Sequence, residues 1–162
     1  MIQQIGLLIG GSTGNVIYLL GKAAAALTSA GIGVGVAVKY GESPLVTVSA
    51  AVAAMVGGYA GKITGGTFFV DGNAVLAGPG EPLGAFIAAF AGITCGHLVS
   101  GKTKVDIIVT PVITIGAGSV VGLLVGPPIS QMMTGLGSII NWATEQRPFI
   151  MASLFRSSWV WF

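Results

Sequence analysis

Long apolar stretches separated by short polar segments dominate this sequence. Four of them approach or exceed the roughly 20 apolar residues that a membrane-spanning helix needs. They are residues 14–38, 44–61, 83–101 and 105–126. Most charged residues fall between these stretches, as a bilayer requires, because a charge at its centre is costly. The pattern predicts helices that cross a membrane.

A chain of buried β-strands is the rival interpretation. Residues 105–115 are rich in β-branched side chains and would suit a strand in water. Membrane barrels, however, need alternating apolar and polar residues, and these stretches are apolar on all sides. A lone strand in lipid would also leave its backbone unpaired. We therefore expect an all-α polytopic transmembrane bundle with about four to five spans, forming one membrane domain over residues 1–162.

Composition supports a lipid environment. Only 7% of the residues are charged and 53% are hydrophobic, whereas soluble domains carry about 25% charged residues. The net charge of +2 is small and scattered along the chain. Such a charge predicts no nucleic-acid partner. The lipid bilayer is the expected surrounding.

Glycine is abundant, with 27 of 162 positions, and much of it follows a four-residue period. This period places small residues on one helical face, where helices in lipid can approach closely. The small-residue ladders are Gly57 and Gly61; Gly84, Ala88, Gly92 and Gly96; and Gly118, Gly122 and Gly126. Each ladder predicts a helix contact. The cluster Gly31, Gly33 and Gly35 instead predicts a loosened helix end or a bend.

Glycine and proline also mark the expected ends of helices. Pro127 and Pro128 should end the fourth span, since adjacent prolines cannot continue a helix. The following residues, 129–142, would then form a short interfacial or re-entrant segment. Residues 62–82, rich in glycine and proline, predict either a water-facing loop or a re-entrant hairpin.

The strongest polar cluster follows that segment. Asn141, Trp142, Glu145 and Gln146 lie within six residues. An aromatic ring can cover the apolar face of a sugar while amides and a carboxylate bind its hydroxyls. An interfacial loop with a tryptophan anchor explains the same residues equally well.

Three further residues or pairs have candidate chemistry. Asp106 and Thr110 share a helical face at four-residue spacing, which fits either an acid at a helix N-terminus or ligand contact. His97 fits a packed or interfacial histidine better than a proton relay. The single Cys95 lacks metal-site spacing and fits a buried small residue. No metal site is expected.

Several separate motifs together resemble one protein family. They are KTKVDIIVTP at 102–111, GPPI at 126–129, MTGLG at 133–137, INWATEQ at 140–146 and PFIM at 148–151. The sequence resembles enzyme IIC, the membrane permease subunit of the bacterial phosphoenolpyruvate-dependent sugar phosphotransferase system, and more narrowly a less-studied branch of it.

The resemblance implies a multi-pass protein of the bacterial inner membrane that forms a homodimer. It implies sugar transport coupled to phosphorylation by soluble phosphotransferase components, with no cofactor on this chain. The phosphate-carrying residue belongs to the soluble partner, so neither Cys95 nor His97 has that role. Asn141, Trp142, Glu145, Gln146, Asp106 and Thr110 are the expected substrate-binding residues. The alternatives are a membrane protein that binds a ligand without transport and a non-functional fragment.

The two ends of the chain depart from the family pattern. Members of this branch are about twice as long and continue with further helices after PFIM, whereas residues 152–162 form an atypical tail. The chain therefore resembles a truncated permease. From the resemblance, we expect no sugar uptake by these 162 residues without a partner membrane subunit.

Overall fold

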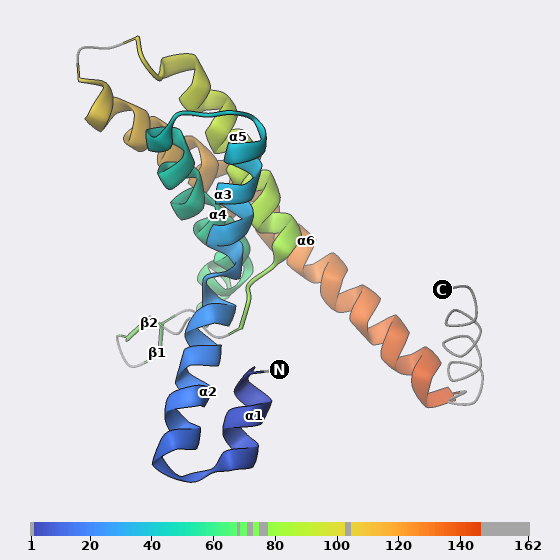
Figure 1. Cartoon of the computed structure of the whole chain (residues 1–162). Helices are drawn as coiled ribbons and strands as arrows, with labels where there is room; N and C mark the ends of the chain where they lie inside the picture. Colours follow the sequence, from blue (N-terminus) through green and yellow to red (C-terminus); the bar gives the residue numbers. More distant parts are fainter. Residues whose placement is uncertain (1, 68, 71–72, 75–77, 103–104, 147–162) are drawn as a thin grey trace, which may run out of the picture. The chain divides into compact units, whose positions relative to one another are not determined.

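Helices make up most of the part of the chain that the structure describes. The computed structural model describes residues 2–67, 69–70, 73–74, 78–102 and 105–146. In chain order the elements are α1 (Ile2–Ile9), α2 (Gly11–Ala26), α3 (Thr28–Lys39), α4 (Pro44–Thr64), β1 (Phe69–Val70), β2 (Asn73–Ala74), α5 (Pro82–Val99) and α6 (Asp106–Gln146) (Figure 1). The chain comprises two compact units, Met1–Ile129 and Ser130–Phe162. The all-α prediction is confirmed, whereas the single domain over 1–162 stays a prediction.

Three of the described helices are long and apolar enough to cross a membrane, namely α4, α5 and the part of α6 from Asp106 to Trp142. The pair α2 and α3 adds a fourth candidate if it forms one span. The membrane bundle that the sequence predicts is thus confirmed, with three to four spans among the described residues. The expected tail at 152–162 lies outside them.

The first predicted span is broken, but not where the glycine cluster suggested. α2 and α3 meet at Leu27 with a bend of 43°. Gly31, Gly33 and Gly35 all lie inside α3, so the predicted bend at these residues is wrong. Gly33 has a packing role instead: a Cβ there would lie 2.5 Å from the backbone oxygen of Ala50 in α4.

A tight turn joins α3 to α4. Gly41 has φ of 72° and donates its N–H to the Val38 oxygen, while Glu42 donates its N–H to the Ala37 oxygen. This is the Schellman arrangement, which pairs the last carbonyls of a helix. Ser43 then caps α4, because its hydroxyl accepts a hydrogen bond from the Val46 N–H at 3.4 Å. The turn therefore fixes the position of Glu42.

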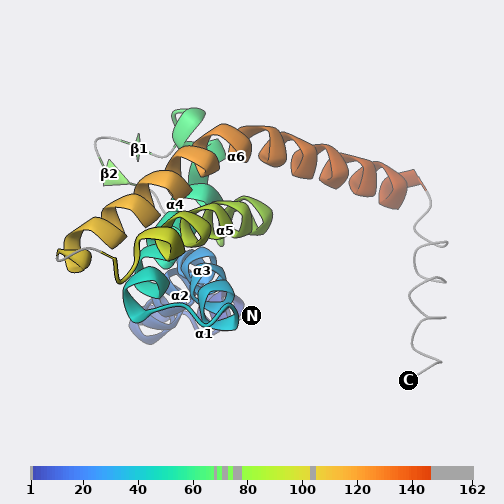
Figure 2. The ribbon, with the colours of Figure 1, turned by 90° about the horizontal axis from the view of Figure 1, so that it is seen from above.

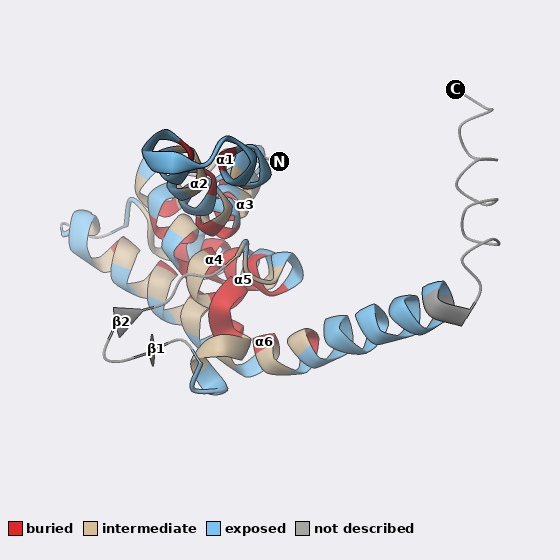
Figure 3. Ribbon diagram, turned by 90° about the horizontal axis from the view of Figure 1, so that it is seen from below, coloured by how far each residue is buried: buried red, intermediate tan, exposed pale blue. Residues whose placement is uncertain are grey.

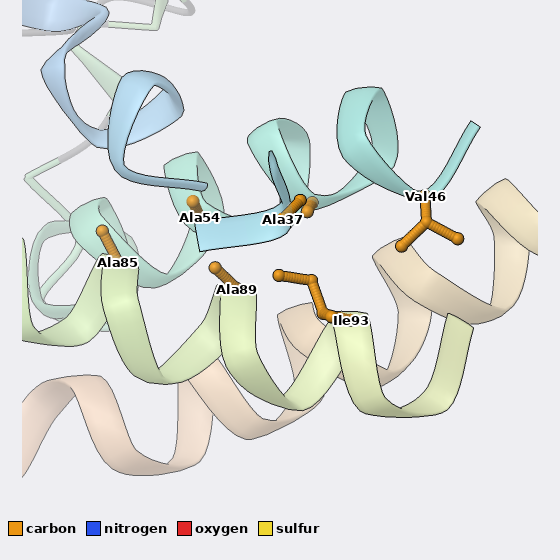
Figure 4. Close-up of a cluster of buried hydrophobic side chains, with 7 residues drawn as sticks. Ala37, Val46, Ala54, Ala85, Ala89 and Ile93 are labelled. Atoms are coloured by element: carbon orange, nitrogen blue, oxygen red, sulfur yellow. The ribbon is translucent and has the colours of Figure 1, made fainter. Parts of the chain in front are cut away.

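Figure 2 shows α3, α4 and α5 grouped together. Small side chains fill the core between these helices (Figure 4). The buried cluster consists of Ala37, Val46, Ala50, Ala54, Ala85, Ala89 and Ile93. Helix α4 packs against both α3 and α5. The alanines allow close approach, which is the main source of attraction between helices in lipid.

The predicted small-residue ladders are helix contacts. A Cβ on Gly92 of α5 would lie 2.7 Å from the Thr114 backbone oxygen in α6. A Cβ on Gly122 of α6 would lie 2.8 Å from the Gly57 Cα in α4. A Cβ on Gly84 of α5 would likewise lie 2.7 Å from the Gly57 backbone oxygen in α4. The ladder prediction is therefore confirmed for α4, α5 and α6.

Helix α6 does not end at its paired prolines. It runs for 41 residues with Pro111, Pro127 and Pro128 inside it, so the predicted helix end is wrong. Each proline removes one backbone hydrogen bond, yet ending a helix leaves more groups unpaired, and apolar surroundings penalise each of them. Residues 129–142 consequently belong to α6 and do not form a separate re-entrant segment. Its stretch from 131 to 142 is exposed (Figure 3).

The segment between α4 and α5 returns to the bundle. β1 and β2 form a small antiparallel pair, with Phe69 opposite Ala74. Residues 78–81 then bind the helices: the Ser29 hydroxyl donates to the Pro79 oxygen at 2.8 Å, and the Glu81 N–H donates to the Gly58 oxygen at 2.7 Å. The Tyr59 hydroxyl donates to the Gly78 oxygen at 2.5 Å. The end of this loop is thus part of the packed structure.

We expect Gly122→Leu to lower the free energy of unfolding by about 1–3 kcal/mol, because the side chain would force α6 away from α4. The matched control is Gly116→Leu in the same helix, where a Cβ meets nothing within 4 Å. Denaturation in detergent measures both variants. Equal losses of stability in the two would show that the small-residue face does not hold the bundle together.

Candidate functional site

Polar side chains of the first unit gather at one end of the helices. The α3–α4 turn and the α5–α6 connection both lie there, since the hydroxyls of Ser43 and Ser100 are 3.1 Å apart. Ser43 begins α4 and Ser100 ends α5. Glu42, His97 and Asp106 belong to the same connections or to the adjoining helical turns. Short connections between antiparallel helices therefore bring separate parts of the sequence together.

A contact between a histidine and a carboxylate links the two connections. The Nδ1 atom of His97 lies 3.0 Å from Oε1 and 3.2 Å from Oε2 of Glu42. The Glu42 side chain is only 8% exposed, whereas that of His97 is 71% exposed. A mostly buried carboxylate needs a hydrogen-bond donor, and His97 supplies it. Because Nδ1 faces Glu42, Nε2 is the ring nitrogen that can meet a ligand.

This pair forms part of the wall of a groove between α3 and α5, which we call the α3–α5 groove. It has a volume of about 400 Å³ and is lined by Tyr40, Glu42, Phe90, Ile93, Thr94, His97 and Leu98. The rings of Tyr40 and Phe90 have centroids 5.9 Å apart and are tilted by 60°. Small-molecule sites combine mostly apolar walls with a few placed polar groups. The groove has that composition.

The predicted pair of Asp106 and Thr110 exists. The Thr110 hydroxyl donates to Oδ1 of Asp106 at 2.6 Å, and the Gly101 N–H donates to the same oxygen at 3.0 Å. Thr110 is fully buried. Asp106 also lies in the first turn of α6, where a negative charge is favourable. These contacts favour the interpretation of Asp106 as the acid that holds the start of α6.

The other predicted site residues lie at the far end of α6, in the second unit. Asn141 and Trp142 are exposed, Trp142 by 65%. Glu145 and Gln146 are helical, but their side chains lie outside the described part. Helical spacing puts Asn141 beside Glu145 and Trp142 beside Gln146. The four residues therefore share one helical region, and their role in sugar binding stays a prediction.

Sequence reasoning missed Tyr40 and Glu42 as site residues. The available signal was Gly41 after an apolar helix, which marks a helix end and fixes the residue after it. Their partners Phe90 and His97 are about 50 residues away, so only the packing of α3 on α5 joins them. Cys95 is free and half-buried, and among the described residues no three His, Cys, Asp or Glu side chains form a metal-like cluster.

Comparison with known proteins gives one family. The family model described as "Phosphotransferase system, EIIC" matches residues 1–160. No curated protein and no solved structure matches the chain significantly. The family match therefore covers both units of the structure.

We expect Asp106→Ala to lower the free energy of unfolding by about 1–3 kcal/mol, since it leaves the buried Thr110 hydroxyl without its acceptor. Thr110→Val removes that hydroxyl and keeps the shape. The two losses should not add: the double variant should be about 1 kcal/mol more stable than their sum predicts. A double-mutant cycle in detergent measures this coupling. Additive losses would show that the 2.6 Å contact contributes nothing.

Proposed function

The chain belongs to the EIIC family of the phosphotransferase system, and we propose that it carries a sugar across the bacterial inner membrane. The family match over residues 1–160 is the observation that carries this proposal. The bundle of apolar helices agrees with it, because EIIC proteins are the membrane components of this transport system. In the proposal a soluble phosphorylated partner modifies the sugar as it arrives.

The chemistry is divided between the chain and its partner. A sugar hydroxyl attacks the phosphoryl group on the partner, the bond between that group and the partner breaks, and the hydroxyl proton is released. This chain would bind and orient the sugar. We assign no phosphate-carrying role to Cys95, which is half-buried, or to His97, which pairs with Glu42. We further propose that the chain forms a homodimer.

The proposed sugar contacts include the residues singled out in the sequence. Trp142 would cover the apolar face of the ring, while Asn141, Glu145 and Gln146 bind hydroxyls. For Asp106 and Thr110 sugar contact stays a prediction from the sequence, because their 2.6 Å hydrogen bond already accounts for them at the start of α6. Exposure of Asn141 and Trp142 supports their availability to a ligand.

Uptake by vesicles tests the proposal. The chain is produced together with a partner membrane subunit and soluble phosphotransferase components, and vesicles are supplied with labelled sugars and phosphoenolpyruvate. We expect a sugar phosphate to accumulate only when phosphoenolpyruvate is present. Binding without accumulation would favour the alternative, a ligand-binding membrane protein that does not transport. Absence of both would reject a sugar function.

Variants of the α6 residues refine this test. Glu145→Gln and Trp142→Leu should each lower uptake by about tenfold, as expected for losing one hydrogen bond to a charged group or one stacked ring. Ser138→Ala is the matched control on the same helix, because its hydroxyl donates within the helix to the Gly135 oxygen. If Glu145→Gln and Trp142→Leu both take up sugar as fast as Ser138→Ala, Glu145 and Trp142 do not belong to the site.

A further inference from the structure

The α3–α5 groove contains a contact between two ionisable side chains, Glu42 and His97, in a helical membrane protein. His97 lies in the last turn of α5, and the exposed Thr94 lies about one turn earlier on the same helix. An ionisable side chain facing hydrocarbon is costly, and such residues usually face a polar cavity or another polar group. The exposed face of His97 therefore marks a place where water or a polar ligand meets the helices.

The groove offers three kinds of contact to a ligand. Glu42 presents a carboxylate that is held by the α3–α4 turn and by His97. His97 presents a ring nitrogen that is not directed at Glu42. Phe90 and Tyr40 present two tilted rings, and Phe90 is itself held by stacking on Phe86, with centroids 6.3 Å apart. Acceptor, donor and aromatic surface thus lie around one space of about 400 Å³.

We propose that the α3–α5 groove binds a neutral sugar or sugar alcohol. Glu42 accepts a hydrogen bond from one hydroxyl through the part of its carboxylate that lines the groove, and Nε2 of His97 exchanges a hydrogen bond with a second. The rings of Phe90 and Tyr40 cover the C–H face of the ligand. This is a site in addition to the α6 residues, and its importance for transport rests on the proposed function.

The charge of the site determines which form of a sugar it accepts. Glu42 puts a carboxylate into the wall of the groove. A phosphate ester would bring about two further negative charges towards the carboxylate. Like charges at this range repel in surroundings of low polarity. The groove should therefore bind the free sugar and reject its phosphorylated product.

The single histidine makes a direct experiment possible. His97 is the only histidine among the 162 residues, so protein labelled with ¹³C and ¹⁵N at histidine gives one imidazole signal. The full chain in nanodiscs is titrated with glucose, mannitol and N-acetylglucosamine, and with the 6-phosphate of glucose. We expect a saturable shift of the signal with at least one neutral compound. Glucose 6-phosphate should bind at least tenfold more weakly than glucose.

Two groove variants and one control locate the binding. Glu42→Gln keeps the shape but removes the charge, and Phe90→Leu removes the flat ring; each should weaken binding about tenfold or more. Leu83→Ala is the control, because Leu83 is exposed in the first turn of the same helix and does not line the groove. Unfolding in detergent confirms that each variant is folded. The control should bind as the unchanged chain does.

The outcomes separate this inference from the proposed function. Sugar that binds, by equilibrium dialysis, without shifting the His97 signal would overturn the groove as the site and leave sugar transport standing. A saturable shift that Glu42→Gln weakens, in a chain that accumulates no sugar phosphate, would support the groove and count against transport. Absence of binding by all three neutral compounds would overturn the groove proposal, and uptake of labelled sugar would then decide the proposed function alone.

Discussion

Close approach of backbones around α4 is the constraint on which the first unit depends. Gly57 of α4 lies against both Gly84 of α5 and Gly122 of α6, with no room for a side chain at either contact. Lipid supplies no hydrophobic force between helices, so dispersion at such short range must hold them. Because α4 meets α3 through alanines as well, the three neighbours are placed by one helix. The remaining features of this unit follow from that placement.

The polar end of the helices is one such consequence. Once the four helices are packed, with short connections from α3 to α4 and from α5 to α6, the α3–α4 turn must lie beside the end of α5. Ser43 then meets Ser100, and Glu42 meets His97. The same packing leaves the α3–α5 groove open next to this pair. Contacts among glycine and alanine thus position the groups that have chemistry, although none of these small residues has any.

The sequence predicted correctly those features that depend on a single helix. It did not predict features that depend on how two helices pack together. The spans and the faces of Gly92, Gly118 and Gly122 follow from period and length alone. The start of α6 at Asp106 followed from a local pair with Thr110. Local propensity predicted neither the break at Leu27 nor the continuation of α6 through Pro127 and Pro128. Both depend on which backbone N–H and C=O groups find hydrogen-bond partners in the packed bundle. The groove escaped because its walls are distant in sequence.

The small-residue faces have an entropic consequence. Glycine and alanine have no rotamers, so packing their faces together costs no side-chain entropy. Longer side chains lose freedom when they are held, and in the first unit Glu42, Phe90 and His97 are held at the groove by a histidine–carboxylate contact or a ring contact. At the polar end of this unit, the side chains that packing holds in fixed positions are therefore mainly those that line the groove. A ligand that enters the groove therefore contacts side chains that are already ordered, so binding costs little additional side-chain entropy.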